Sequence, residues 1–150
     1  MTLTEILFYA LHIPIIPAWT LLIFAPRHRL TRHWVHSGVI PLILAGAYTL
    51  LLGAALFFGQ SASQANMTSL PGVLALFSHP VGALTAWAHF LAYDLFVGAW
   101  IARDADRLAL SHKGTAPILI LALVFAPIGL ALHLLRRRAT GVGLSLGLAD

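Results

Sequence analysis

The chain has 150 residues, of which 59% are hydrophobic and 9% are charged, and its mean hydropathy is +0.88. Because a soluble domain typically has about a quarter charged residues, this composition excludes an ordinary soluble protein and indicates a single-domain membrane protein. The sequence has no cysteine, which excludes disulfides and thiolate metal sites. The net charge is +4, and the basic residues lie at the edges of apolar runs, a pattern that indicates membrane orientation rather than nucleic-acid binding.

Four segments are apolar and long enough to cross a bilayer as helices. They cover residues 5–25, 37–58, 81–102 and 116–135. We therefore predict an all-α integral membrane bundle of four transmembrane helices, which forms a single domain over residues 1–138. Residues 139–150 are small and glycine-rich without a helix-capping signal, and they are predicted to be a flexible tail.

The first segment contains His12, followed closely by Pro14 and Pro17. Each proline removes a backbone hydrogen bond that neighbouring groups must replace. The pattern is typical of packing kinks in membrane helices. Alternatively, the two prolines open the helix beside a site and expose a carbonyl group there.

The connections between the segments differ in charge. Residues 26–36 and 103–115 together hold six Lys and Arg residues, whereas residues 59–80 hold no Lys, Arg, Asp or Glu. The positive-inside rule places the two basic connections on the cytoplasmic side or its equivalent, and both termini on the opposite side. The run Arg136–Arg138 counts against this orientation, because a fourth crossing would put it with the termini.

Part of the second connection does not have the composition of a loop. Residues 69–80 are too apolar for a free loop and too short to span the membrane. We predict that they form an interfacial or re-entrant half-helix, which could roof a cavity.

The third segment carries a carboxylate near its middle. Asp94 is the only Asp, Glu, Lys or Arg in residues 81–102. An ionised and unpartnered carboxylate at that depth costs several kcal/mol, so Asp94 should be protonated, hydrogen-bonded or facing a wet or protein-lined cavity. His89 lies about one and a half turns away and offers an acid/base companion, although an angle of about 140° separates the two side chains. Alternatively, both residues serve only helix packing.

Helix geometry also gives the depth of each polar residue in the membrane, measured from the face that carries the second connection. His12 and His89 lie about 10–12 Å from the face that carries the second connection, Asp94 lies about 8 Å deeper, and His133 lies close to that face. A pocket that opens toward this face could collect all four side chains. His12 and His89 also meet the depth condition for a haem ligand pair, which is a third alternative.

The remaining polar signals are weaker. Arg103 and Asp104 end the third segment, where they are expected to anchor the helix end or bind a lipid headgroup. The sequence has no glycine-rich phosphate loop, nucleophile elbow or zinc-protease motif. Nucleotide hydrolysis and zinc proteolysis are therefore unsupported. For the reaction considered below, which needs neither, we expect no metal and no cofactor.

Residues 77–104 carry a specific motif. It consists of Phe77, Ser78, Pro80, Trp87, His89, Phe90, Leu91, Ala92, Tyr93, Asp94, Leu95, Phe96, Val97, Gly98, Trp100, Ile101 and Asp104. This motif resembles that of the abscisic-acid-deficient-four-like family of four-span membrane proteins, which includes plant neoxanthin synthase. Looser similarity runs over nearly the whole chain, but Ala86 and Ala126 stand where the plant pattern commonly has glycine.

The resemblance implies a carotenoid or other isoprenoid substrate and an intramolecular isomerisation that opens a 5,6-epoxide into an allene and a tertiary alcohol. This reaction needs a base at a polyene carbon and an acid at the ring oxygen, without redox change. His89 and a neutral Asp94 could supply these roles in either order. The expected lining of an apolar substrate groove is Trp87, Phe90, Tyr93, Trp100 and His12.

The expected partners are membrane lipids and the hydrophobic substrate, with no nucleic acid, and the sequence leaves the oligomeric state open. Whether the chain is an enzyme at all is also open. The alternative is a non-catalytic scaffold or pigment-binding protein that uses Asp94 and His89 only for helix assembly.

Overall fold

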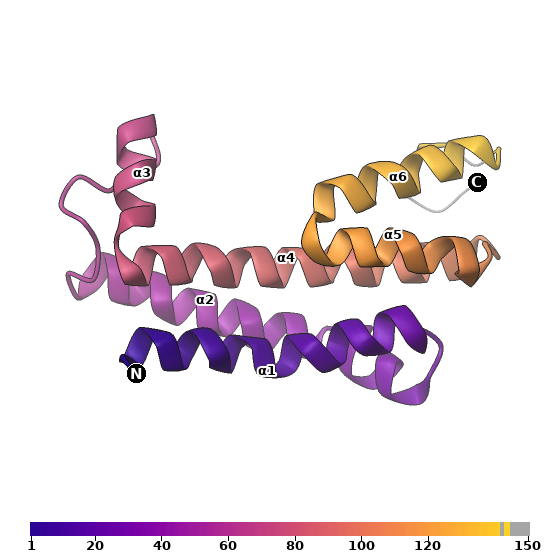
Figure 1. Cartoon of the computed structure of the whole chain (residues 1–150), viewed down its shortest axis with the longest axis horizontal. Coiled ribbons are helices and arrows are strands. Elements are labelled where there is room, and N and C mark those ends of the chain that lie inside the picture. The colour runs from indigo at the N-terminus through magenta and orange to yellow at the C-terminus, as the bar shows by residue number, and fades with distance from the viewer. Residues whose placement is uncertain (142, 145–150) are drawn as a thin grey trace. The chain divides into compact units, whose positions relative to one another are not determined.

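The computed structural model describes residues 1–141 and 143–144, and these residues contain helices and no strand (Figure 1). The all-α prediction is therefore confirmed. The helices are α1 (Leu3–Phe24), the short π-helix η1 (Thr31–Val35), α2 (Val39–Phe57), α3 (Leu70–Ser78), α4 (Pro80–Arg107), α5 (His112–Val124) and α6 (Ala126–Ala139).

Three of the predicted spans are present as long apolar helices. α1, the segment Thr31–Phe57 and α4 are each long and apolar enough to cross a membrane. α1 continues through Pro14 and Pro17, so the two prolines do not break it. Many large apolar side chains on these helices are exposed, as expected for surfaces that contact lipid rather than water. These features indicate that the protein associates with a membrane.

The predicted fourth span, residues 116–135, is not one helix. α5 ends at Val124, the backbone of Phe125 is non-helical with φ −139° and ψ 74°, and α6 begins at Ala126. Pro127 lies in the first turn of α6, where its missing N–H costs nothing, whereas inside a continuous helix its ring would clash with the preceding turn. The prediction of one continuous helix was wrong, because it counted apolar length and treated Pro127 as a kink, whereas a fourth crossing of the membrane stays a prediction.

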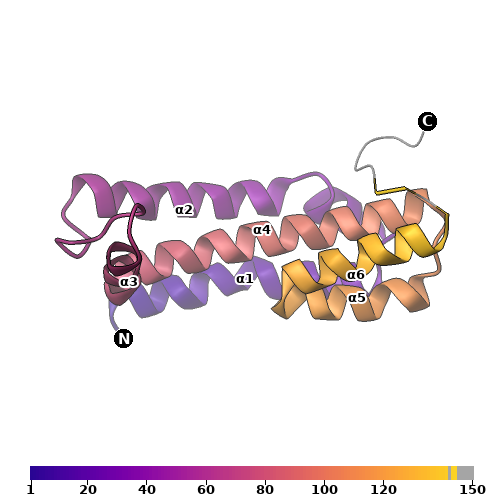
Figure 2. The same cartoon turned by 90° about the horizontal axis from the view of Figure 1, so that it is seen from above.

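α5 and α6 form a hairpin, and their axes run side by side (Figures 1 and 2). Gly129 allows this close contact, because a Cβ atom on Gly129 would lie 2.5 Å from the Cβ of Ala122. At the open end of the hairpin, Arg136 donates hydrogen bonds to the hydroxyl of Thr115 at 2.8 Å and to the carbonyl of Ser111 at 3.0 Å. The C-terminal end of α6 therefore lies beside the start of α5.

The half-helix expected over residues 69–80 is present as α3. Ser69 caps it, because its hydroxyl accepts a hydrogen bond from the backbone N–H of Gly72 at 3.2 Å. α3 ends where His79 turns to an extended backbone, and Pro80 then begins α4. α3 runs crosswise to α4 (Figures 1 and 2). Its interfacial or re-entrant position in a membrane stays a prediction.

The helices belong to two compact units. The first unit comprises Met1–Pro17 and Gly38–Tyr93, and the second comprises Ala18–Ser37 and Asp94–Asp150. The first unit therefore holds the start of α1, α2, α3 and the start of α4, whereas the second holds the rest of α1 and α4 with η1, α5 and α6. The single domain over residues 1–138 stays a prediction. In the expected tail, Ala139 ends α6, and residues 142 and 145–150 lie outside the described residues.

Candidate functional site

His89 lies at an apolar cavity in the first unit. The cavity has a volume of about 380 Å³, and its walls come from α2, α3 and α4. The imidazole ring of His89 lies 5.6 Å from the ring of Tyr48 on α2 and 4.6 Å from the ring of Tyr93 on its own helix, measured between ring centroids. The apolar lining includes Leu52, Ala55, Val73, Leu76, Phe77 and Phe90. This cavity thus places His89 and the hydroxyl-bearing ring of Tyr48 against a surface suited to a hydrophobic ligand.

A glycine brings α3 close enough to line this cavity. A Cβ atom on Gly82 of α4 would lie 2.0 Å from the backbone oxygen of Leu76 in α3, so only glycine fits there without movement of α3. Thr85, on the same stretch of α4, is buried, and its hydroxyl donates to the carbonyl of Val81 at 2.7 Å. The half-helix predicted to roof a cavity therefore does line one.

His12 has partners for both ring nitrogens. Its Nε2 accepts a hydrogen bond from the indole N–H of Trp87 at 3.3 Å, and its Nδ1 donates to the carbonyl of Phe8 at 2.7 Å. His12 and Trp87 therefore link α1 to α4 inside the first unit. Because neither ring nitrogen is available to a metal in this arrangement, the geometry does not favour the haem alternative.

Asp94 lies five residues beyond His89 on α4 and is partly buried. It is the first residue of the second unit's part of that helix, whereas His89 belongs to the first unit. The joint action of His89 and Asp94 in one pocket therefore stays a prediction, as does the wider pocket that would include His12 and His133.

Asp104 is the centre of a buried charge cluster in the second unit. Its Oδ2 atom accepts from His133 Nε2 at 2.8 Å and from Arg137 Nη1 at 3.0 Å, and its Oδ1 atom accepts from Arg107 Nη2 at 2.9 Å. Asp104, His133 and Arg137 are 4%, 0% and 1% exposed. Two guanidinium groups offset the charge of one carboxylate, and the cluster ties α6 to the end of α4.

Trp100 completes this cluster. Its ring meets the ring of His133 edge-on with 5.4 Å between centroids, and the guanidinium carbon of Arg137 lies 5.9 Å from the indole centroid. The sequence analysis did not predict the cluster, and it assigned Trp100 to the substrate groove. The available signal was a pair of i, i+4 spacings, Trp100 with Asp104 and His133 with Arg137, each of which puts two side chains on one helix face.

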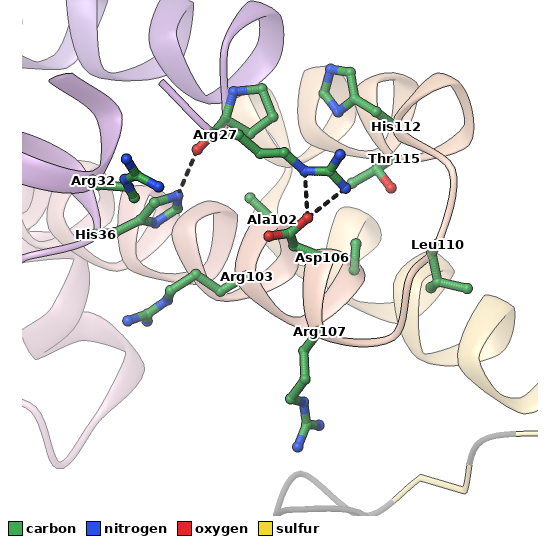
Figure 3. Close-up of a pocket in the computed structure, with 12 residues that line it drawn as sticks. Arg27, Arg32, His36, Ala102, Arg103, Asp106, Arg107, Leu110, His112 and Thr115 are labelled. Carbon is green, nitrogen blue, oxygen red and sulfur yellow. Dashed lines mark hydrogen bonds and ion pairs between the residues drawn. The ribbon is translucent and has the colours of Figure 1, made fainter. Parts of the chain in front are cut away.

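A second cavity, the basic pocket, lies at the ends of several helices of the second unit (Figure 3). Its volume is about 440 Å³. Arg27 reaches across it and pairs with Asp106 at 2.5 Å, and His36 Nε2 donates to the carbonyl of Pro26 at 3.2 Å. The other charged or polar residues that line it are Arg32, Arg103, Arg107, His112 and Thr115. The first and third connections therefore meet at this pocket.

Comparison with known proteins agrees with the resemblance carried by residues 77–104. The Arabidopsis thaliana protein named "Protein ABA DEFICIENT 4, chloroplastic" is 26% identical over 123 residues, which cover 79% of this chain and 54% of the plant protein. The chain thus spans about half the length of this curated relative. No solved structure matches the chain. A family model described as ABA DEFICIENT 4-like matches residues 6–133, from the first turn of α1 to His133 in α6, and the chain therefore belongs to the ABA DEFICIENT 4-like family.

Proposed function

We propose that this protein is a membrane-embedded acid/base enzyme that isomerises a carotenoid or another isoprenoid. The observation that carries the proposal is the position of His89, an imidazole in the wall of an apolar cavity, within the motif that the chain shares with its family. A cavity of about 380 Å³ accommodates the end group of a long isoprenoid, and the rest of such a molecule would lie along the exposed apolar helix faces.

The proposed reaction is the opening of an epoxide within one molecule. A base removes a proton from the polyene carbon, the carbon–oxygen bond of the epoxide breaks, and an acid delivers a proton to the oxygen, so that substrate and product are isomers. His89 can act as the base at the cavity. Asp94 remains the donor that the sequence suggests, and the Tyr48 hydroxyl is a second donor beside the same cavity. The opposite assignment, with Asp94 as base and His89 as acid, gives the same overall reaction.

We further propose that α1, the segment Thr31–Phe57 and α4 each cross the membrane, with the basic connections on the cytoplasmic side or its equivalent. The α5–α6 hairpin supports this orientation. It brings Arg136, and with it the run Arg136–Arg138, to Ser111 and Thr115 of the third connection, so this run no longer counts against the positive-inside rule. In this arrangement the end of α6 lies on the side of the basic connections, opposite to the N-terminus.

The enzyme proposal is tested by pigment extraction from cells that produce violaxanthin or zeaxanthin. Cells that express the protein are expected to form a new pigment with the mass of its epoxidised precursor. Positioned acid/base groups contribute about 10²- to 10⁴-fold to such reactions, so His89→Ala should reduce product formation by about 100-fold or more. Asp94→Asn and Tyr48→Phe then distinguish the two candidate donors. His33→Ala, which removes an exposed imidazole from η1, is the matched control and should leave product formation unchanged.

The alternative function is that of a non-catalytic scaffold or pigment-binding protein. The observation in its favour is that the lining around His89 is apolar and would hold a rigid isoprenoid without reacting with it. Unchanged pigments across a panel of epoxidised and plain xanthophylls, combined with co-purification of one pigment, would establish this alternative and refute the enzyme.

A further inference from the structure

We propose that the basic pocket binds a phosphate-bearing anion, and that in the membrane this anion is the headgroup of an anionic phospholipid. The proposal is independent of the carotenoid chemistry, because the basic pocket lies in the second unit and the cavity at His89 lies in the first.

The charges that line the basic pocket do not balance. Four arginines line it, but Arg27 pairs with Asp106, the single carboxylate among the lining residues, and Arg107 pairs with Asp104, so that Arg32 and Arg103 carry the surplus charge. Among the described residues, no carboxylate forms an ion pair with Arg32 or Arg103. A guanidinium group presents planar donors that match phosphate oxygens, so an anion with several oxygens would offset this surplus.

The side chains that line the basic pocket are held in place by the protein. Arg103 Nε donates to the carbonyl of Ala99 at 3.3 Å, and His112 Nε2 donates to the carbonyl of Ile23 at 2.8 Å. Arg32 and Arg103 lie on either side of His36 (Figure 3). Because backbone carbonyls already position two of these side chains, less conformational entropy is lost when an anion binds.

The sequence position of the basic pocket indicates a lipid rather than a soluble phosphate. Arg27 follows the end of α1 at Phe24, His36 precedes the start of α2 at Val39, and Arg103 lies in the last turns of α4. The ends of membrane-crossing helices lie at the depth of the headgroups. Trp34, in η1, is 45% exposed, and tryptophan is enriched at this interface.

The rest of the lining fits the part of a phospholipid next to its phosphate. Pro26, Ala102, Ala105 and Leu110 give the basic pocket an apolar share of its wall. A glycerol backbone and the first carbons of an acyl chain would contact these side chains, while the phosphate would contact the arginines. Mixed basic and apolar pockets of this kind bind anionic lipid headgroups in other membrane proteins.

The test uses the full chain purified in detergent, with lipid binding counted by native mass spectrometry and the melting temperature measured in parallel. Phosphatidylglycerol is the anionic probe, phosphatidylcholine is the zwitterionic reference, and inorganic phosphate and diphosphate are the soluble probes. We expect phosphatidylglycerol to bind and to raise the melting temperature more than phosphatidylcholine does. The double variant Arg32→Gln/Arg103→Gln should weaken phosphatidylglycerol binding by about tenfold or more, because two charge-assisted contacts are lost.

The matched control is Arg29→Gln/Arg138→Gln, which removes the same two charges from exposed positions that do not line the basic pocket. It should change phosphatidylglycerol binding by less than about twofold, because a general surface attraction is weak at each exposed charge. Equal weakening in both double variants would overturn the proposal in favour of diffuse surface charge. Stabilisation by inorganic phosphate or diphosphate without phosphatidylglycerol binding would keep the anion site but overturn the lipid as its ligand. The absence of any binding would overturn the proposal entirely.

Discussion

At the scale of single residues, burial decides how strongly a charged side chain contributes to stability. Asp104 lies at the end of a long apolar helix, where a carboxylate is ordinarily solvated, yet it is 4% exposed and bound by Arg107, His133 and Arg137. Asp106, two residues later, forms an ion pair with Arg27, but both side chains of this pair are largely exposed. Burial therefore separates two aspartates that look alike in the sequence.

This difference predicts unequal effects on stability. Asp104→Asn removes the charge that offsets the buried Arg137 and should lower the free energy of unfolding by about 3–5 kcal/mol. Asp106→Asn removes an exposed pair and should cost at most about 1 kcal/mol. Thermal unfolding of the two purified variants in the same detergent measures the contrast. Similar melting temperatures for both would show that the Asp104 cluster does not hold α6 to α4.

At the scale of helices, glycines decide which elements pack closely. Gly129 lies against Ala122 in the α5–α6 hairpin, whereas a Cβ atom on Gly46 of α2 would meet nothing within 4 Å. The same residue type is thus required at the first position and replaceable at the second. Gly82, between α3 and α4, is a further position where a side chain does not fit.

Gly129 and Gly46 form a matched pair for substitution. Gly129→Ala places a methyl group 2.5 Å from Ala122 Cβ and should destabilise the protein by about 1–3 kcal/mol, because the helices must separate. Gly46→Ala should be neutral or stabilising by up to about 1 kcal/mol, because alanine favours the helix and has room there. Melting curves in detergent compare the two. A neutral Gly129→Ala variant would contradict the close hairpin.

At the scale of the whole molecule, the basic residues are confined to one of the two units. All nine Lys and Arg residues belong to the second unit, and the residues of the first unit include none. Among the residues that the structure describes, three helices are long and apolar enough to cross a membrane, and α5, with 13 residues, extends only about 20 Å, which is shorter than a hydrocarbon core of about 30 Å. In the proposed topology, three crossings followed by the α5–α6 hairpin would put the N-terminus and the end of α6 on opposite sides of the membrane.

Cysteine accessibility tests this topology, and the absence of native cysteine makes each introduced thiol unique. Lys113→Cys and Arg138→Cys should react with a membrane-impermeant reagent from the same side, because α6 returns to the start of α5. Ser63→Cys, in the second connection, should react only from the opposite side. Labelling of Arg138→Cys together with Ser63→Cys would instead establish a fourth crossing and contradict the hairpin.

Several features followed from the sequence alone, because they depend on local properties. Apolar length predicted the three long helices, and a short apolar stretch bounded by turn signals predicted α3. The motif around His89 and Asp94 predicted the family. Each of these inferences uses neighbouring residues only, so no knowledge of distant contacts is needed.

Only the tertiary structure decided the rest. Residues 116–135 turn at Phe125 instead of continuing as one helix, because packing of Gly129 against Ala122 and the bonds of Arg136 to the start of α5 favour a hairpin that apolar length cannot reveal. His133 and Arg137, which bind Asp104, come from a helix about 30 residues away, and the contacts of His89 include Tyr48 on α2. Which polar side chains meet depends on how separate helices pack, and this information lies in contacts between distant residues rather than in local pattern.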